Sequence, residues 1–182
     1  MIEKILATID SPGNKSVFDT AVSLAKTMDA KLMLLHILSE TDLDYPVLPT
    51  HVYYSVLRGN DNSILHQKFY EYERQEAEFL SYLTQKAIAM GIDAEYAQLK
   101  GVPGWEICKA ASAWTADLIL IGSRGLKGIK EILVGSVSNY VSHHAPCSVL
   151  IVRSDTKVSY PISLPSPEKT EVDSKHEVFN QN

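Results

Sequence analysis

Short apolar segments alternate with longer helical segments along most of the chain, and this alternation constrains the fold more than any other feature. The segments that we expect to be strands are residues 4–9, 31–37, 94–99, 118–121 and 148–152. The helices expected between them cover residues 14–28, 65–87, 103–114 and 136–143. Strand and helix in alternation predict an α/β sandwich with a mainly parallel sheet. Most of the strands are apolar almost throughout, which is typical of a sheet that helices cover on both faces.

The composition is that of an ordinary globular chain with a modest negative charge. Its 182 residues include 17 Lys and Arg against 22 Asp and Glu, which leaves a net charge of −5. Nucleic-acid-binding proteins normally carry a basic surplus, so the charge argues against nucleic acid as a partner. Two cysteines are too few for a disulfide framework and indicate reduced thiols in the cytoplasm. We expect no signal peptide and no membrane insertion, because the apolar segments are far too short.

Two segments fall outside the alternation of strands and helices. Residues 39–62 contain two prolines and a glycine, which predicts a long loop. In residues 154–182 prolines and charged residues are frequent, and the apolar residues follow no period. We therefore divide the chain into a domain over 1–153 and a disordered or loosely docked tail over 154–182. The alternative is a lid that becomes ordered when a ligand or partner binds.

A glycine-rich segment after the fourth expected strand is the strongest functional signal. It reads Gly-Ser-Arg-Gly at 122–125 and, nine residues later, Gly-Ser at 135–136. Glycines let backbone amides approach a ligand closely, and the second pair opens a helix whose free amides attract anions. The hydroxyls of Ser136 and Ser138 can add donors, and Arg124 or Lys127 can add positive charge. The cluster predicts a site for nucleotide phosphates; the alternative is a pair of tight turns and a helix cap.

Other common nucleotide-binding motifs are missing from the sequence. No G-x-x-x-x-G-K-[ST] occurs, and no G-x-G-x-x-G follows the first strand, so the usual kinase, GTPase and dinucleotide-binding classes lose their main support. In open α/β sheets ligands bind at the carboxyl ends of the strands, where the winding reverses. Asp10 follows the first strand, where an acid would reach a ribose hydroxyl. The alternative for Asp10 is a turn residue that caps the helix at Asn14.

The glycine-rich segment also carries a resemblance to a known family. Its spacing is G-2x-G-9x-G-(S/T), and the strings KILATIDSP, KLMLLHIL, LILIGSRG, ILVGSVS and HHAPCSVLIVR flank or accompany it in order. Over residues 1–153 the chain resembles the universal stress protein family, in its nucleotide-binding branch. The resemblance implies a Rossmann-like α/β sandwich with a five-stranded, mainly parallel sheet in the order 3-2-1-4-5.

The resemblance further implies which residues bind ATP or another adenine nucleotide, with or without Mg²⁺. Asp10 would meet the ribose or the adenine edge, and Ile37 would lie along the adenine, although Ile37 is equally well explained as core. The glycine-rich segment would frame the ribose and phosphates. The full set is Thr8, Ile9, Asp10, Ile37, Ile121, Gly122, Arg124, Gly125, Gly135, Ser136, Val137 and Ser138.

The histidines do not suggest a metal centre. His143 and His144 are consecutive, so on a helix their side chains point about 100° apart and cannot serve one site. We interpret them as surface residues at the end of a helix. His36 lies between Leu35 and Ile37 on a buried strand, and we interpret it as a core histidine whose polar atoms are satisfied.

Three functions of different classes are compatible with these observations. The first is a sensor or regulator in stress response that changes state with bound ATP, ADP or AMP. The second is a slow ATPase or another nucleotide-converting enzyme, for which Asp10 is the one convincing candidate group. The third is an interaction module with a vestigial pocket, against which the intact motif argues. We expect no catalytic residue, and at most weak ATP hydrolysis.

The last expected strand, residues 148–152, predicts an oligomeric state. It lies at the edge of the sheet in the order 3-2-1-4-5, and an exposed apolar edge needs cover. The family resemblance implies that two such edges pair antiparallel across a twofold axis, which makes the protein a homodimer.

Overall fold

The fold is described by a computed structural model over residues 1–10, 15–39, 63–123 and 135–153. Within these residues every expected strand and helix is present. In chain order they are β1 (Lys4–Thr8), α1 (Lys15–Met28), β2 (Lys31–Leu38), α3 (Ser63–Ala89), β3 (Ala94–Lys100), α4 (Pro103–Trp114), β4 (Leu118–Ser123), α5 (Ser136–His144) and β5 (Ser148–Arg153). The predicted loop, apart from Ser39, and the predicted tail over 154–182 lie outside the described residues.

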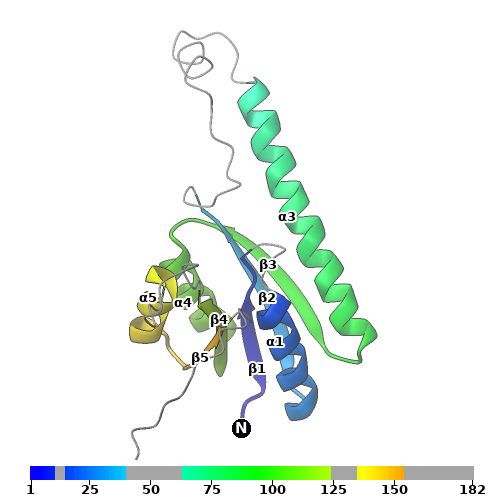
Figure 1. The fold of residues 1–182 in the computed structure, drawn as a ribbon, viewed down its shortest axis with the longest axis vertical. Coiled ribbons are helices and arrows are strands. Elements are labelled where there is room, and N and C mark those ends of the chain that lie inside the picture. Colours follow the sequence, from blue (N-terminus) through cyan, green and yellow to red (C-terminus); the bar gives the residue numbers. More distant parts are fainter. Residues whose placement is uncertain (11–14, 40–62, 124–134, 154–182) are drawn as a thin grey trace, which may run out of the picture.

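The five strands form one sheet in the order β3-β2-β1-β4-β5, and all four neighbouring pairs are parallel (Figure 1). This confirms the predicted fold class and strand order. β4 continues two residues beyond the expected segment because Gly122 and Ser123 pair with Val152 and Arg153 of β5. Only the neighbouring strand provides that pairing, so the local sequence could not predict it.

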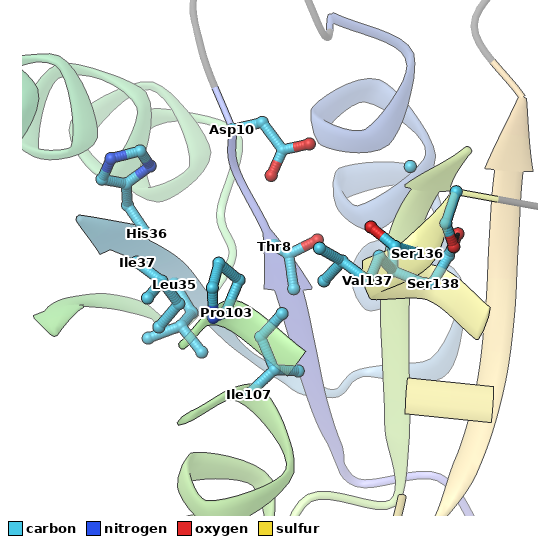
Figure 2. Close-up of a pocket in the computed structure, with 13 residues that line it drawn as sticks. Thr8, Asp10, Leu35, His36, Ile37, Pro103, Ile107, Ser136, Val137 and Ser138 are labelled. Carbon is cyan, nitrogen blue, oxygen red and sulfur yellow. Dashed lines mark hydrogen bonds between the residues drawn. The ribbon is translucent and has the colours of Figure 1, made fainter. Parts of the chain in front are cut away.

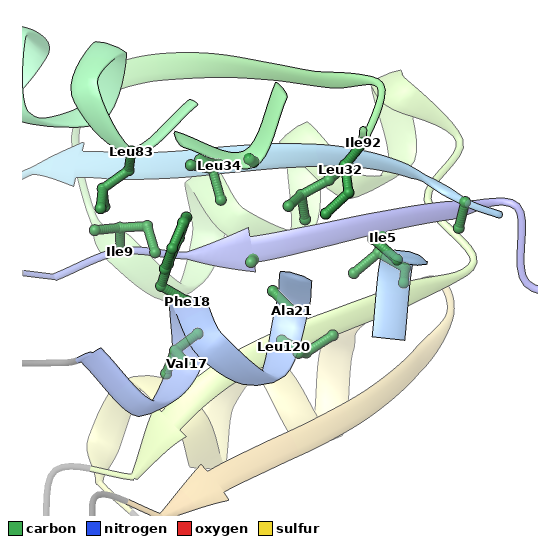
Figure 3. Packing of buried hydrophobic residues seen from close by; sticks show 14 of the residues in the cluster. Ile5, Ile9, Val17, Phe18, Ala21, Leu32, Leu34, Leu83, Ile92 and Leu120 are labelled. Carbon is green, nitrogen blue, oxygen red and sulfur yellow. The ribbon is translucent and has the colours of Figure 1, made fainter. Parts of the chain in front are cut away.

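Helices cover both faces of the sheet, α1 and α3 on one face and α4 and α5 on the other (Figure 1). Under α1 and α3, the strand residues Ile5, Leu34 and Leu120 pack against Val17 and Phe18 (Figure 3). Fully burying one such side chain contributes roughly 1.5–3 kcal/mol. The double burial explains why the strands are apolar almost throughout.

The opposite face has its own core beneath α4 and α5. Leu6 and Ile119 of the sheet are fully buried there, together with Ile107 of α4 and Val141 of α5. Side chains of adjacent residues in a strand point to opposite faces, so Ile5 and Leu6 belong to different clusters. Each strand therefore contributes to both layers of the sandwich.

Helix α3 is much longer than the strands it covers. Its 27 residues span about 40 Å, and its amino-terminal part extends beyond the sheet (Figure 1). The carboxyl-terminal half packs on the sheet through Leu80, Leu83 and Ala87. The helix ends at Ala89, and the predicted stop, Gly91, follows it with φ of +84°, where a glycine is favoured. None of the helices among the described residues combines the length and apolar character needed to cross a bilayer.

Asp117 joins the beginnings of β1 and β4, at the amino ends of the strands. Its Oδ2 accepts hydrogen bonds from the backbone amides of Glu3 at 2.8 Å and Lys4 at 2.9 Å. The Lys4 ammonium in turn donates to the Trp114 carbonyl and to the Thr115 hydroxyl. The two backbone hydrogen bonds lower the pKa of the Asp117 carboxyl below its ordinary value.

This lowered pKa makes a prediction about stability and pH. A carboxyl with a lowered folded-state pKa stabilises the fold above its unfolded-state pKa of about 4, and the contribution is lost as pH falls through the folded value. We expect Asp117→Ala to lower the free energy of unfolding at pH 7, and the gap to the parent to narrow below pH 4. The free energy of unfolding of Asp117→Asn should lie between those of the parent and Asp117→Ala, because an amide oxygen accepts the same hydrogen bonds without the charge. Urea titrations from pH 7 to pH 3 measure this, and a gap that does not change with pH would contradict it.

Candidate functional site

A cavity of about 220 Å³ opens at the carboxyl ends of β1, β2 and β4. The first turns of α4 and α5 complete its walls (Figure 2). It lies where the winding of the sheet reverses, since β1 has β2 on one side and β4 on the other. The residues that line it are Thr8, Asp10, Leu35, His36, Ile37, Pro103, Ile107, Ile121, Gly122, Gly135, Ser136, Val137 and Ser138.

The floor of the cavity is built from the ends of β1 and β4. The buried hydroxyl of Thr8 donates to the carbonyl of Leu120 at 3.3 Å, which ties the two strands together directly below the opening. Ile121 is buried beside them, and Asp10, the first residue after β1 to line the cavity, is half-buried. Asp10 therefore places a carboxylate at the rim of a largely apolar floor.

One wall of the cavity is apolar and comes from β2 and α4. Leu35 and Ile37 lie at the end of β2, and Pro103 and Ile107 lie close to them on the first turns of α4 (Figure 2). Pro103 stands in the first turn of its helix, where the missing N–H has no cost. Such a wall suits a flat, weakly polar ring, which it can contact without leaving a buried polar group unpaired.

The facing wall is polar and comes from the first turn of α5. Gly135 is the N-cap, makes no side-chain hydrogen bond to the helix end, and has φ of −59° and ψ of 157°. That conformation is open to any residue, so the backbone itself does not require a glycine at this position. The Ser138 hydroxyl donates to the Gly135 carbonyl at 3.1 Å and stabilises the turn, while Ser136 is exposed. No acidic residue occupies this turn, so its amides can take an anion.

The cavity gathers nearly all the residues singled out from the sequence. Of the ten within the described residues, nine line it, and the tenth, Ile9, packs in the core beneath α1 and α3. Arg124 and Gly125 lie outside the described residues. Sequence reasoning did not include the other four lining residues in the site, namely Leu35, His36, Pro103 and Ile107. Pro103 offered a signal, since a proline that opens a helix after a strand marks a turn at the carboxyl edge of the sheet.

Gly104 lets α4 and α5 come together beside the cavity. A Cβ built at Gly104 would lie 2.7 Å from Cδ1 and 3.0 Å from Cγ of Tyr140, closer than non-bonded atoms tolerate. Gly104 follows Pro103 directly, so the same close approach brings the apolar wall toward the first turn of α5. The width of the cavity therefore depends on a glycine that never touches it.

Neither cysteine is placed for chemistry in the cavity. Burial raises the pKa of the Cys108 thiol. Burial is also the main reason that the pKa of the Cys147 thiol is raised, and the negative charges of Asp117 and Cys108 raise it further. Both cysteines pack against the core beneath α4 and α5.

Among the described residues no three metal-ligating side chains come together. His143 and His144 are exposed at the end of α5, as predicted.

Comparison with known proteins identifies the family. A model of the universal stress protein family matches residues 1–153. The chain belongs to the universal stress protein family. Universal stress protein Sll1388 of Synechocystis is 34% identical over 151 residues, covering 82% of this chain and 97% of its own. Universal stress protein YxiE of Bacillus subtilis is 34% identical over 154 residues, a match that covers 84% of this chain and 100% of YxiE.

Solved structures of the family share the fold. The universal stress protein from Archaeoglobus fulgidus, solved in complex with dAMP, superposes with a TM-score of 0.53. It is 20% identical, and the match covers 84% of this chain and 99% of that one. At this identity the likeness supports the common architecture of the two proteins.

The Gly104 contact makes a prediction about stability. We expect Gly104→Ala to lower the free energy of unfolding by about 1–3 kcal/mol, because the new methyl group overlaps the Tyr140 ring. In a Tyr140→Ala background the same change should cost little or even stabilise, because alanine favours a helix over glycine by about 1 kcal/mol. Urea denaturation of the four proteins gives the coupling between the two sites. Equal costs in both backgrounds would show that the helices are not in contact there.

Proposed function

We propose that this universal stress protein binds an adenine nucleotide in the cavity and acts as a sensor or regulator in stress response. The observation that carries the proposal is the pairing of two unlike walls across one opening. The uncapped first turn of α5 faces an apolar wall formed by Ile37, Pro103 and Ile107. A ligand that is an anion at one end and a flat ring at the other matches both walls.

The phosphates belong at α5 in this proposal. The first turn of a helix presents backbone amides without partners and the positive end of the helix dipole. Gly135 and Gly122 border this region without bulky side chains, so a phosphate oxygen can approach the backbone. The predicted roles of Arg124 and Gly125 as further contacts belong to the same proposal.

The adenine and the ribose fill the rest of the cavity. Adenine would lie against Ile37, which is 8% exposed, with Pro103 and Ile107 on the neighbouring wall. Asp10 would accept hydrogen bonds from the ribose hydroxyls, a role for which a carboxylate at a strand end is well suited. Membership of the family and the dAMP held by the Archaeoglobus fulgidus protein support this assignment.

A binding role fits the lining residues better than a catalytic one. Phosphoryl transfer needs a positioned base and usually ligands for metal ions around the γ-phosphate. Among the described residues that line the cavity, Asp10 is the carboxylate. Mg²⁺, weak ATP hydrolysis and a cytoplasmic location stay predictions, and an assay of ADP formation from ATP distinguishes a sensor from a slow ATPase.

Nucleotide binding is tested first on protein purified without added nucleotide. Mass spectrometry of the released ligand should detect an adenine nucleotide, and calorimetry should then measure ATP, ADP and AMP affinities. Gly135→Val should weaken binding by about a thousandfold, because two or three charge-assisted hydrogen bonds of roughly 1.5–3 kcal/mol each are lost. Ser136→Ala should cost less, since the backbone amide remains.

The Gly135→Val protein should still fold, because valine adopts the observed φ and ψ without strain. Circular dichroism and thermal melting provide the control. Unchanged affinity in a correctly folded Gly135→Val protein would mean that the phosphates bind elsewhere. A parent protein that binds none of the three nucleotides would overturn the proposed function.

We also propose that the protein is a homodimer through Ser148–Val152. β5 ends the described sheet, and Leu150 on it is 38% exposed. An apolar edge strand is prone to pair with a second copy unless charge prevents it. Leu150→Lys should convert the dimer to a monomer in light scattering at micromolar concentration. Met28→Lys is a matched control, since Met28 is 39% exposed on α1, and a monomeric parent would contradict the proposal.

A further inference from the structure

We propose that His36 is a positioning residue for the nucleotide site and that it acts by fixing the peptide that precedes Asp10. The inference rests on the proposed function and extends it to a residue interpreted above as plain core. The His36 ring is one of the few polar side chains buried in the described part of the protein, with 5% of the residue exposed. Its two nitrogens are in different situations, and the difference indicates what the ring does.

The Nδ1 atom makes a hydrogen bond at the point where β1 leaves the sheet. The pairing of β1 with β2 ends at Thr8 and Leu35, and the Ile9 amide still donates to the Leu35 carbonyl at 2.8 Å. The Ile9 carbonyl then accepts from Nδ1 of His36 at 2.6 Å. Because a carbonyl oxygen only accepts, Nδ1 carries the hydrogen. The side chain thus continues the connection between the strands beyond the last backbone pair.

That bond acts directly on the approach to Asp10. The Ile9 carbonyl and the Asp10 amide belong to one planar peptide unit, so a donor that holds the carbonyl also fixes the orientation of the whole unit. Figure 2 shows the His36 ring on the opposite side of β2 from Leu35 and Ile37, directed away from the apolar wall. Its effect on a nucleotide therefore passes through Asp10 rather than through contact with the adenine.

The Nε2 atom shows that packing alone does not explain a histidine here. It is buried and has no hydrogen-bond partner among the described residues, so the prediction that the polar atoms of His36 are satisfied is wrong for this nitrogen. Oε2 of Glu76 on α3 is 3.8 Å away, beyond hydrogen-bond distance. A leucine or valine would fill this strand position without burying an unsatisfied nitrogen. The hydrogen bond that offsets this cost is the one from Nδ1 to the Ile9 carbonyl; Glu76 can add an ion pair only when the ring is protonated.

Helix α3 confines the ring on its outer side. One turn before Glu76, the Glu73 carbonyl accepts from Nε2 of Gln98 at 3.2 Å, and the Glu73 carboxylate pairs with Lys100. These contacts hold α3 against the carboxyl end of β3, next to the end of β2. The imidazole is therefore enclosed between α3 and β1, and it has little freedom to give up the Ile9 carbonyl.

Two amide substitutions separate the nitrogens. In His36→Asn the side-chain NH₂ lies near the Nδ1 position, so it can still donate to Ile9. In His36→Gln the NH₂ lies near the Nε2 position and the donor to Ile9 is lost. By calorimetry with ATP and AMP we expect His36→Asn to stay within about threefold of the parent and His36→Gln to weaken binding about tenfold, the loss typical of one hydrogen bond.

A double-mutant cycle tests whether His36 acts through Asp10. In an Asp10→Ala background, His36→Gln should cause no further loss of affinity, because the group that His36 positions is gone. Independent losses in the two backgrounds would overturn the proposal. Equal affinities of the His36→Asn and His36→Gln variants would also overturn it. This holds if both variants bind as tightly as the parent, and if both bind more weakly and also melt at lower temperatures.

A second measurement does not depend on any ligand. The ¹⁵N NMR signal of the Asp10 amide responds to hydrogen bonding at the Ile9 carbonyl, since both belong to one peptide unit. In the nucleotide-free protein this signal should move more in His36→Gln than in His36→Asn, and the reverse would overturn the proposal. If the parent binds ATP or AMP and the variants do not differ, the proposed function stands and only this inference fails. If the parent binds neither, both fail.

Discussion

The three central strands of the parallel sheet, β1, β2 and β4, bury side chains on both of their faces, and the rest of the structure depends on this. Ile5 and Leu6 are adjacent, yet each is fully buried in a different core. Both faces must therefore be covered, and parallel strands can be joined only by connections that cross from one end of the sheet to the other. Helices provide the cover and the crossing together. The double burial thus dictates the alternation of strand and helix seen along the chain.

A consequence of the parallel arrangement is that the carboxyl ends of all strands meet at one edge. The helices that follow start from that edge, so the first turns of α4 and α5 lie near one another. The two turns present different surfaces, because α4 contributes Pro103 and Ile107 whereas α5 contributes Gly135 and polar residues. The chemical asymmetry of the cavity arises from this difference between two helix beginnings on one scaffold.

The opposite edge of the sheet serves stability. There Asp117 and Lys4 satisfy backbone groups where β1 and β4 begin. At the carboxyl ends of the strands the polar contacts instead lie beside the cavity. Thr8 joins β1 to β4 beneath it, and His36 joins β1 to β2 at its rim. The end of β1 is thereby held from both sides just before Asp10. A rigid strand end is what a binding residue in a loop requires for a defined position.

The sequence by itself determined the class of fold, the strand order through its family resemblance, and most of the residues of the candidate site. The fold class follows from apolar periodicity and turn residues, whereas the strand order and the full set of site residues follow from the family resemblance, which the glycine spacing from 122 to 136 helps to carry. Tertiary structure alone decided the rest. Gly104 matters because Tyr140, 36 positions away, packs against it, and His36 matters because Nδ1 meets the Ile9 carbonyl across two strands. A local pattern cannot report such contacts, because they arise only when distant segments are brought together by the burial of both faces of the sheet.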